Sequence, residues 1–312
     1  MSTEGRFARF KEDMKPRMKD IRFTLRKIRN TPLSLVGIGL ILFYVVIAII
    51  APLLAPPVDP NNPFLIPQAE TVYNEPFPPN ANHLFGTTYG QIDIYYGCIW
   101  GVRAAFRLGI IVIAGTLAIG LSLGLVAGYY GGLLDEIIMR FTDIILAFPG
   151  LILTMALIIA LSRQGIARLD SAIIGIVIVG WPGYTRLIRG EVLRVKTEDY
   201  VEAARASGAS DLRIIGKHIL PNGIYPVVIV ASLDFGTIVL FAAALSFLGL
   251  GAEARYADWG RLIETSRNAV TEGLRYWWTF TFPGLFITTF CLGWNLMGDA
   301  IRDILDPLYR RK

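Results

Sequence analysis

Long apolar runs alternate with short polar segments along the chain, and most of the runs approach the length of about 20 residues that a helix needs to cross a bilayer. Only 18% of the residues are charged and the mean hydropathy is +0.51, so a soluble core of ordinary size could not bury this apolar material. The pattern predicts an all-α polytopic membrane protein with six transmembrane helices, over residues 33–55, 108–128, 139–161, 172–187, 224–249 and 280–297.

Charge along the chain predicts its orientation. The first 31 residues are strongly basic, whereas residues 56–100 contain no lysine or arginine. Because cytoplasmic segments are enriched in these residues, we expect the N-terminus in the cytoplasm and, with six spans, the C-terminus there too. The expected division is a basic tail 1–31, a retained first transmembrane helix 32–55, an outer loop 56–101, a transmembrane domain 102–307 and a basic C-terminal tail 308–312.

Glycine and proline mark packing features inside the predicted spans. Gly120, Gly124 and Gly128 recur every four residues, so they lie on one helix face and allow a second helix to approach closely. Pro149 falls inside the third span, where it predicts a kink.

A few charged residues lie in or beside the spans. Arg140 and Asp143, three residues apart at the start of the third span, can pair with each other or with the polar segment described next, or form an ordinary surface pair. Asp234 is the acid deep in a span, where a carboxylate must face protein or water. It is therefore a candidate for lining a pathway, and a hydrogen-bonded packing role is the alternative.

The segment from Thr197 to Asn222, which we call the knob, is polar although it separates two apolar runs. Thr197 is expected to cap a short helix, which Gly208 ends. Ser210 is expected to cap a second short helix, stopped by Pro221 before the next span. The sequence therefore predicts a compact helix–turn–helix at the membrane surface, with an ordinary loop as the alternative.

The sequence contains none of the catalytic motifs that we sought. No GxxxxGK[ST] phosphate loop, HExxH motif or serine nucleophile elbow occurs, so we expect no ATP site and no enzyme activity in this chain. Cys98 and Cys291 are far apart in apolar surroundings, which favours packed thiols over a disulfide or a metal site. The basic residues cluster beside the spans, which indicates membrane orientation rather than nucleic-acid binding.

A resemblance to a known family rests on several segments. Glu202-Ala203-Ala204, followed by Gly208 and then Leu220-Pro221, resembles the cytoplasmic EAA motif of permease subunits in binding-protein-dependent ABC importers. The strings MRFTDIILAFP, LSFLGLG, DWGRLI and NLMGDAIRDILDP are similar to the dipeptide, oligopeptide and nickel permeases, in particular to the sister with the shorter outer loop. The similarity runs from about the first span to Pro307.

This resemblance implies a type I ABC importer transmembrane fold in the inner, cytoplasmic membrane. It implies a heterodimer with a sister permease, two ABC ATPase subunits that bind ATP and magnesium, and an extracytoplasmic solute-binding protein. In such importers Glu202 would pair with the ATPase, Ala203 and Ala204 would allow close approach, and Gly208 would permit the turn. The solute could be a peptide, a nickel chelate or an oligosaccharide. A secondary transporter and a non-transporting membrane scaffold are the alternatives, although the chain shows no repeat symmetry between its halves.

Overall fold

The computed structural model describes residues 31–68 and 75–305, so the basic segments 1–30 and 308–312 lie outside the described residues. The described chain folds mainly into helices. In chain order they are α2 (Pro32–Leu54), α3 (Ile94–Tyr130), α4 (Gly132–Leu146), α5 (Gly150–Ser162), α6 (Arg168–Lys196), α7 (Asp199–Ala206), α8 (Asp211–Ile214), a π-helical turn (Ile215–Ile219), α9 (Leu220–Phe247), α10 (Trp259–Thr265), α11 (Arg267–Thr271), a 3₁₀ turn (Gly273–Tyr276) and α12 (Trp278–Leu305).

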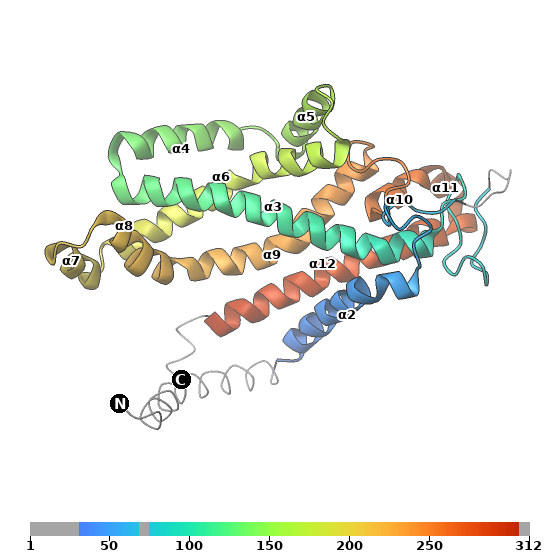
Figure 1. Cartoon of the computed structure of the whole chain (residues 1–312), viewed down its shortest axis with the longest axis horizontal. Coiled ribbons are helices and arrows are strands. Elements are labelled where there is room, and N and C mark those ends of the chain that lie inside the picture. Colours follow the sequence, from blue (N-terminus) through green and yellow to red (C-terminus); the bar gives the residue numbers. More distant parts are fainter. Residues whose placement is uncertain (1–30, 69–74, 306–312) are drawn as a thin grey trace.

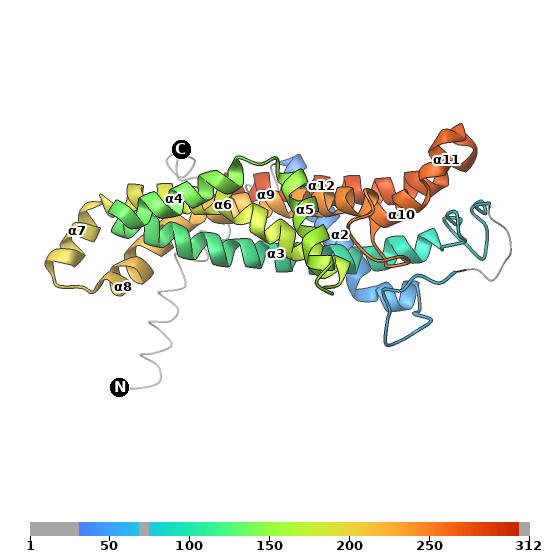
Figure 2. The same ribbon diagram turned by 90° about the horizontal axis from the view of Figure 1, so that it is seen from above.

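The arrangement confirms the expected helical membrane fold. Five helical segments are long and apolar enough to cross a membrane, and the bent pair α4 and α5 makes a sixth span if it is counted as one. These helices form an elongated bundle, with α7 and α8 at one end and α10 and α11 at the other (Figures 1 and 2). Many large apolar side chains of α2 and α4 are exposed, as expected for helices that face lipid or another membrane subunit.

Two local expectations are corrected. α3 begins at Ile94, inside the predicted outer loop 56–101, because the Asp93 carboxylate caps the helix by accepting a 2.8 Å hydrogen bond from the Tyr96 amide. Pro149 does more than kink the third span. It precedes α5 directly, and the axes of α4 and α5 differ by 90° at this break. Proline cannot donate the amide hydrogen bond that would continue the helix.

The predicted glycine stripe packs as expected. A Cβ atom added to Gly120 would lie 2.6 Å from the Tyr184 Cβ, and one added to Gly124 would lie 2.8 Å from the Ile188 Cβ. No real pair of carbon atoms tolerates such distances, so these glycines allow α3 and α6 to approach backbone to backbone. Because α6 leads directly into the knob, this close contact fixes the position from which the knob projects.

Candidate functional site

The first helix of the knob, α7, begins directly after the end of α6. Its N-cap is Glu198, whereas the sequence suggested Thr197. Thr197 instead ends α6, and its hydroxyl donates a 2.9 Å hydrogen bond to the Arg194 carbonyl of that helix. The chain therefore turns from the end of the span into the knob within two residues.

Gly208 ends α7, as predicted. Its φ of +79° lies in the left-handed region, where side chains with a Cβ are strained. The Gly208 amide donates to the Arg205 carbonyl at 3.0 Å, and the Ala209 amide donates to the Ala204 carbonyl at 3.1 Å. These two bonds form a Schellman motif, which satisfies the last carbonyls of the helix and reverses the chain.

The underside of α7 packs on the bundle while its outer face stays free. Val201 is fully buried in an apolar cluster with Val195, Ile214 and other residues of α6, α8 and α9. Glu202 and Ala203 are exposed, whereas Ala204 is half-buried against the same cluster. Only part of the Glu202-Ala203-Ala204 motif thus lies on the surface.

The second half of the knob differs from the prediction. α8 begins after Ser210 as expected, but the Ser210 side chain makes no capping hydrogen bond. Pro221 does not stop this helix, because α8 continues through the π-helical turn into α9, and residues Asp211–Phe247 form one span. In an α-helix the ring of Pro221 would clash with the carbonyl of Lys217, four residues earlier. Lys217 lies in the π turn, which is wider than an α-helical turn, so the helix accommodates the proline ring. Leu220 is half-buried and Pro221 is exposed beside the knob.

Arg140 and Asp143 contact neither each other nor the knob. Asp143 pairs with Arg186 of α6, and Arg140 approaches Glu136 of its own helix at 3.9 Å. Both pairs are substantially exposed, and exposed ion pairs contribute little stability. A gating role for Arg140 and Asp143 remains a prediction.

Asp234 lies half-buried in α9 and accepts a 2.8 Å hydrogen bond from the hydroxyl of Tyr184 in α6. The carboxylate therefore joins the two helices that enter and leave the knob. The hydrogen bond supplies the polar partner that an acid inside a span requires. A pathway-lining role for Asp234 stays a prediction beside this packing role.

Sequence reasoning missed the polar contacts that tie the knob to the bundle. Tyr129, at the end of α3, donates a 2.7 Å hydrogen bond to Asp211 Oδ1, and Lys196 Nζ donates to the Tyr129 carbonyl at 2.6 Å. Nearby, Arg189 of α6 binds both carboxylate oxygens of Asp135 of α4, at 2.5 and 2.7 Å. Each contact joins residues more than 50 positions apart, and no local pattern in the sequence marks them.

Comparisons with known proteins agree with this architecture. Residues 120–311 match the family model described as the binding-protein-dependent transport system inner membrane component. The chain belongs to this permease family. Residues 21–76 also match the N-terminal transmembrane domain of oligopeptide transport permease C.

Several similar proteins are named for peptide transport. The permease is 38% identical to the dipeptide transport system permease protein DppC of Alkalihalophilus pseudofirmus, over 95% of this chain and 92% of the relative. It is 39% identical to the probable D,D-dipeptide transport system permease protein DdpC of Escherichia coli, over 93% of each chain. It is a permease subunit of an ABC peptide importer family and a multi-pass protein of the cell membrane.

A solved structure shares the fold. A chain of the MetNI methionine ABC transporter, solved in inward-facing conformations, superposes with a TM-score of 0.55. The alignment covers 68% of this permease and 97% of that chain, with 19% sequence identity. This similarity identifies the transmembrane fold of type I ABC importers and carries no information on the solute.

Proposed function

We propose that this permease pairs with a sister permease to form the translocation pathway of an ATP-driven importer for short peptides. A solute-binding protein delivers the peptide on the outer side, and two ABC ATPase subunits bind ATP and magnesium on the inner side. Relatives named for dipeptide and oligopeptide transport favour peptides over oligosaccharides or nickel chelates as the solute.

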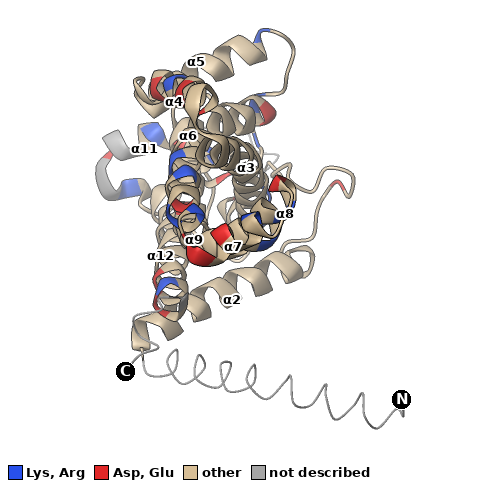
Figure 3. Cartoon of the chain, turned by 90° about the vertical axis from the view of Figure 1, so that its left-hand side faces the viewer, with Lys and Arg blue, Asp and Glu red and all other residues tan. Residues whose placement is uncertain are grey.

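The observation that carries this proposal is the form of the knob. It projects beyond the bundle at one end (Figure 1), where charged residues gather on α7, α8 and the end of α6 (Figure 3). Glu202 and Ala203 face outward, and Glu202 makes no ion pair within the described part of the chain. An exposed acid on a short, well-anchored helix can bind basic groups of an ATPase by charge-assisted hydrogen bonds.

Rigid attachment lets the knob transmit movement. α7 is fixed by the buried Val201, by the Schellman motif at Gly208 and by the bond from Tyr129 to Asp211. A displacement of α7 by closing ATPases therefore moves α3, α6 and α9 together, whereas a loosely attached loop would absorb it. This coupling would change the access of the pathway from one side of the membrane to the other.

The proposal assigns the two ends of the bundle to the two sides of the membrane. The knob and both termini lie in the cytoplasm, because the basic segments 1–31 and 308–312 flank the first and last spans. The opposite end, with the loop after α2 and the segment containing α10 and α11, faces the solute-binding protein.

Reconstitution of the whole complex tests the proposed function. The permease, its sister and the ATPases are inserted into proteoliposomes, and uptake of a radiolabelled dipeptide is measured with the solute-binding protein outside. Uptake that requires both ATP and the binding protein is expected. Uptake driven by an ion gradient without ATP would identify a secondary transporter, and no uptake under any condition would favour a scaffold.

A further inference from the structure

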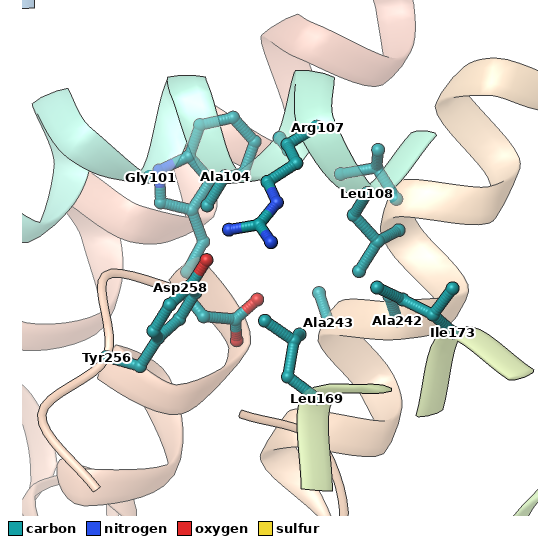
Figure 4. A pocket seen from close by; sticks show the side chains of 13 residues that line it. Gly101, Ala104, Arg107, Leu108, Leu169, Ile173, Ala242, Ala243, Tyr256 and Asp258 are labelled. Atoms are coloured by element: carbon teal, nitrogen blue, oxygen red, sulfur yellow. The ribbon is translucent and has the colours of Figure 1, made fainter. Parts of the chain in front are cut away.

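An open cavity lies at the end of the bundle opposite the knob, between α3, the start of α6, the second half of α9 and the loop before α10 (Figure 4). Water-sized groups have about 20 Å³ of free space inside it, enough for about one ordered water, and the cavity opens to solvent. The room exists because small residues form much of the wall, namely Gly101, Ala104, Ala105, Ala242 and Ala243.

Three polar side chains converge on this apolar cavity. Figure 4 shows the guanidinium of Arg107 pointing into it, with the Tyr256 hydroxyl and the Asp258 carboxylate on the facing wall. The Arg107 guanidinium lies near the Tyr256 oxygen, and its positive charge partly offsets the effect of burial on the pKa of Tyr256. Burial raises the pKa of Tyr256 to about 12, so the hydroxyl keeps its proton at neutral pH and can donate it to a ligand.

Asp258 does not neutralise Arg107. Across residues 31–68 and 75–305, no carboxylate oxygen lies within 4.0 Å of the Arg107 guanidinium. The Asp258 carboxylate accepts a 2.8 Å hydrogen bond from the Arg261 amide and also binds the Ser246 hydroxyl. Burial raises the pKa of Asp258, and the hydrogen bonds from Arg261 and Ser246 oppose this rise. Within the described residues, Arg107 therefore lines the cavity without a directly paired carboxylate.

The depth of Arg107 favours a side chain that faces water over one that faces lipid. The Trp100 indole donates a 2.8 Å hydrogen bond to the Ala55 carbonyl, so Trp100 lies level with the end of the first span. Arg107 is about two helical turns further along α3, roughly 10 Å deeper. Its side chain is exposed, and an arginine at this depth is strongly disfavoured against lipid but tolerated in a water-filled cavity.

We propose that this cavity is a subsite for the terminal carboxylate of a short peptide, with Arg107 as the anion-binding residue and Tyr256 as a second donor. Arginine binds carboxylates through two parallel hydrogen bonds, a geometry that the exposed guanidinium of Arg107 can offer. The inference rests on the proposed function. A phospholipid phosphate is the other anion that could reach an arginine at this depth.

Protection of a cysteine in the cavity wall tests the subsite. The assembled complex is placed in phosphatidylcholine nanodiscs, with Cys98 and Cys291 replaced by alanine and Leu169→Cys as the reporter. Leu169 lines the cavity and is half-buried, so a maleimide can reach it. Alanyl-alanine at millimolar concentration is expected to slow labelling at least fivefold, and its C-terminal amide is expected to have no effect.

Variants of two arginines locate the anion site. Arg107→Gln is expected to abolish protection, and Arg107→Lys to retain part of it because the charge remains. Arg103→Gln is the matched control, since Arg103 stacks over the Trp100 ring at 5.2 Å and does not line the cavity. Equal protection by the acid and the amide, or full protection in Arg107→Gln, contradicts the subsite.

The same preparation separates the subsite from its alternatives. If phosphatidylglycerol nanodiscs protect the reporter without peptide, the anion is a lipid headgroup and the proposal is overturned. ATP-dependent uptake of alanyl-alanine in proteoliposomes reports the proposed function separately. Uptake without protection contradicts the subsite alone, whereas protection without uptake supports the subsite and contradicts the importer.

Discussion

Tyr129 and Asp211 join the far end of α3 to the second helix of the knob through a 2.7 Å hydrogen bond, across 82 positions of sequence. Lys196 holds the same tyrosine from α6, with Nζ 2.6 Å from its carbonyl oxygen and 5.7 Å from the centre of its ring. Tyr129 is thus the point at which two spans and the knob meet. A hydrogen bond to a charged group contributes about 1.5–3 kcal/mol.

Removing this hydroxyl is expected to loosen the knob without disturbing the bundle. Tyr129→Phe keeps the ring and its packing but leaves Asp211 without its tyrosine donor. We expect ATP hydrolysis stimulated by the loaded binding protein to fall about fivefold or more, with assembly intact. Tyr130→Phe is the control, because Tyr130 is exposed and its ring packs edge-on against Tyr129. Equal activity in both variants would remove Tyr129 from the coupling route.

Gly208→Val isolates backbone strain in the knob. A Cβ at Gly208 would meet no atom within 4 Å, so the effect comes from the positive φ and not from a clash. Strain of about 1–3 kcal/mol is expected, enough to displace α7 or open its C-terminal turn. Stimulated ATP hydrolysis should fall steeply while the permease still inserts and pairs with its sister.

Gly216→Val is the matched control for that variant. Gly216 also has open space around its Cβ position, but its φ is not positive. Its substitution should leave most of the stimulated hydrolysis intact. Similar losses in the two variants would show that bulk on the knob, and not the turn at Gly208, matters.

The contrast between Gly208 and Pro221 shows what the sequence could predict. Gly208 was recognised because a helix-ending glycine is a local signal, and the glycine stripe at Gly120 and Gly124 was recognised because its spacing is regular. Pro221 was misread as a stop because its tolerance depends on a π turn formed by the preceding residues. Hydropathy predicts six spans, and the described residues contain five long apolar helices and the bent pair α4 and α5, which makes a sixth if counted as one.

Pairings across the bundle escaped prediction for a different reason. The sequence offers Arg140 or the knob as a partner for Asp143, but Asp143 binds Arg186 of another helix. The Arg107 cavity likewise combines four separate elements of the fold. Such contacts depend on how the helices are placed beside one another, which periodicity alone does not encode.

Substitutions of Asp234 distinguish a packing role from a pathway-lining role. Asp234→Leu removes the acceptor for the buried Tyr184 hydroxyl and should destabilise the permease by about 1–3 kcal/mol. Asp234→Asn keeps an oxygen acceptor and should unfold at nearly the original temperature. Combining Asp234→Leu with Tyr184→Phe should recover much of the loss. If Asp234→Leu leaves thermal stability unchanged but stops peptide uptake, pathway lining explains this residue better.

The orientation is tested by labelling in intact cells. Asn80 and Ser210 are both exposed, in the loop after α2 and in the knob respectively. In a cysteine-free background, Asn80→Cys should react with an impermeant maleimide added outside. Ser210→Cys should react only after lysis. Labelling of Ser210→Cys in intact cells would contradict the assigned topology.

The central claim is that the exposed face of α7 binds an ATPase, and Glu202→Lys tests it most directly. The change places a positive charge where the proposed partner is basic, without altering the backbone. Glu136→Lys, on α4 and 65% exposed, makes the same charge change outside the knob. The measurement is the affinity of the purified ATPase subunits for the permease pair in nanodiscs. The account predicts about tenfold weaker binding for Glu202→Lys and unchanged binding for Glu136→Lys, whereas unchanged affinity in Glu202→Lys would contradict it.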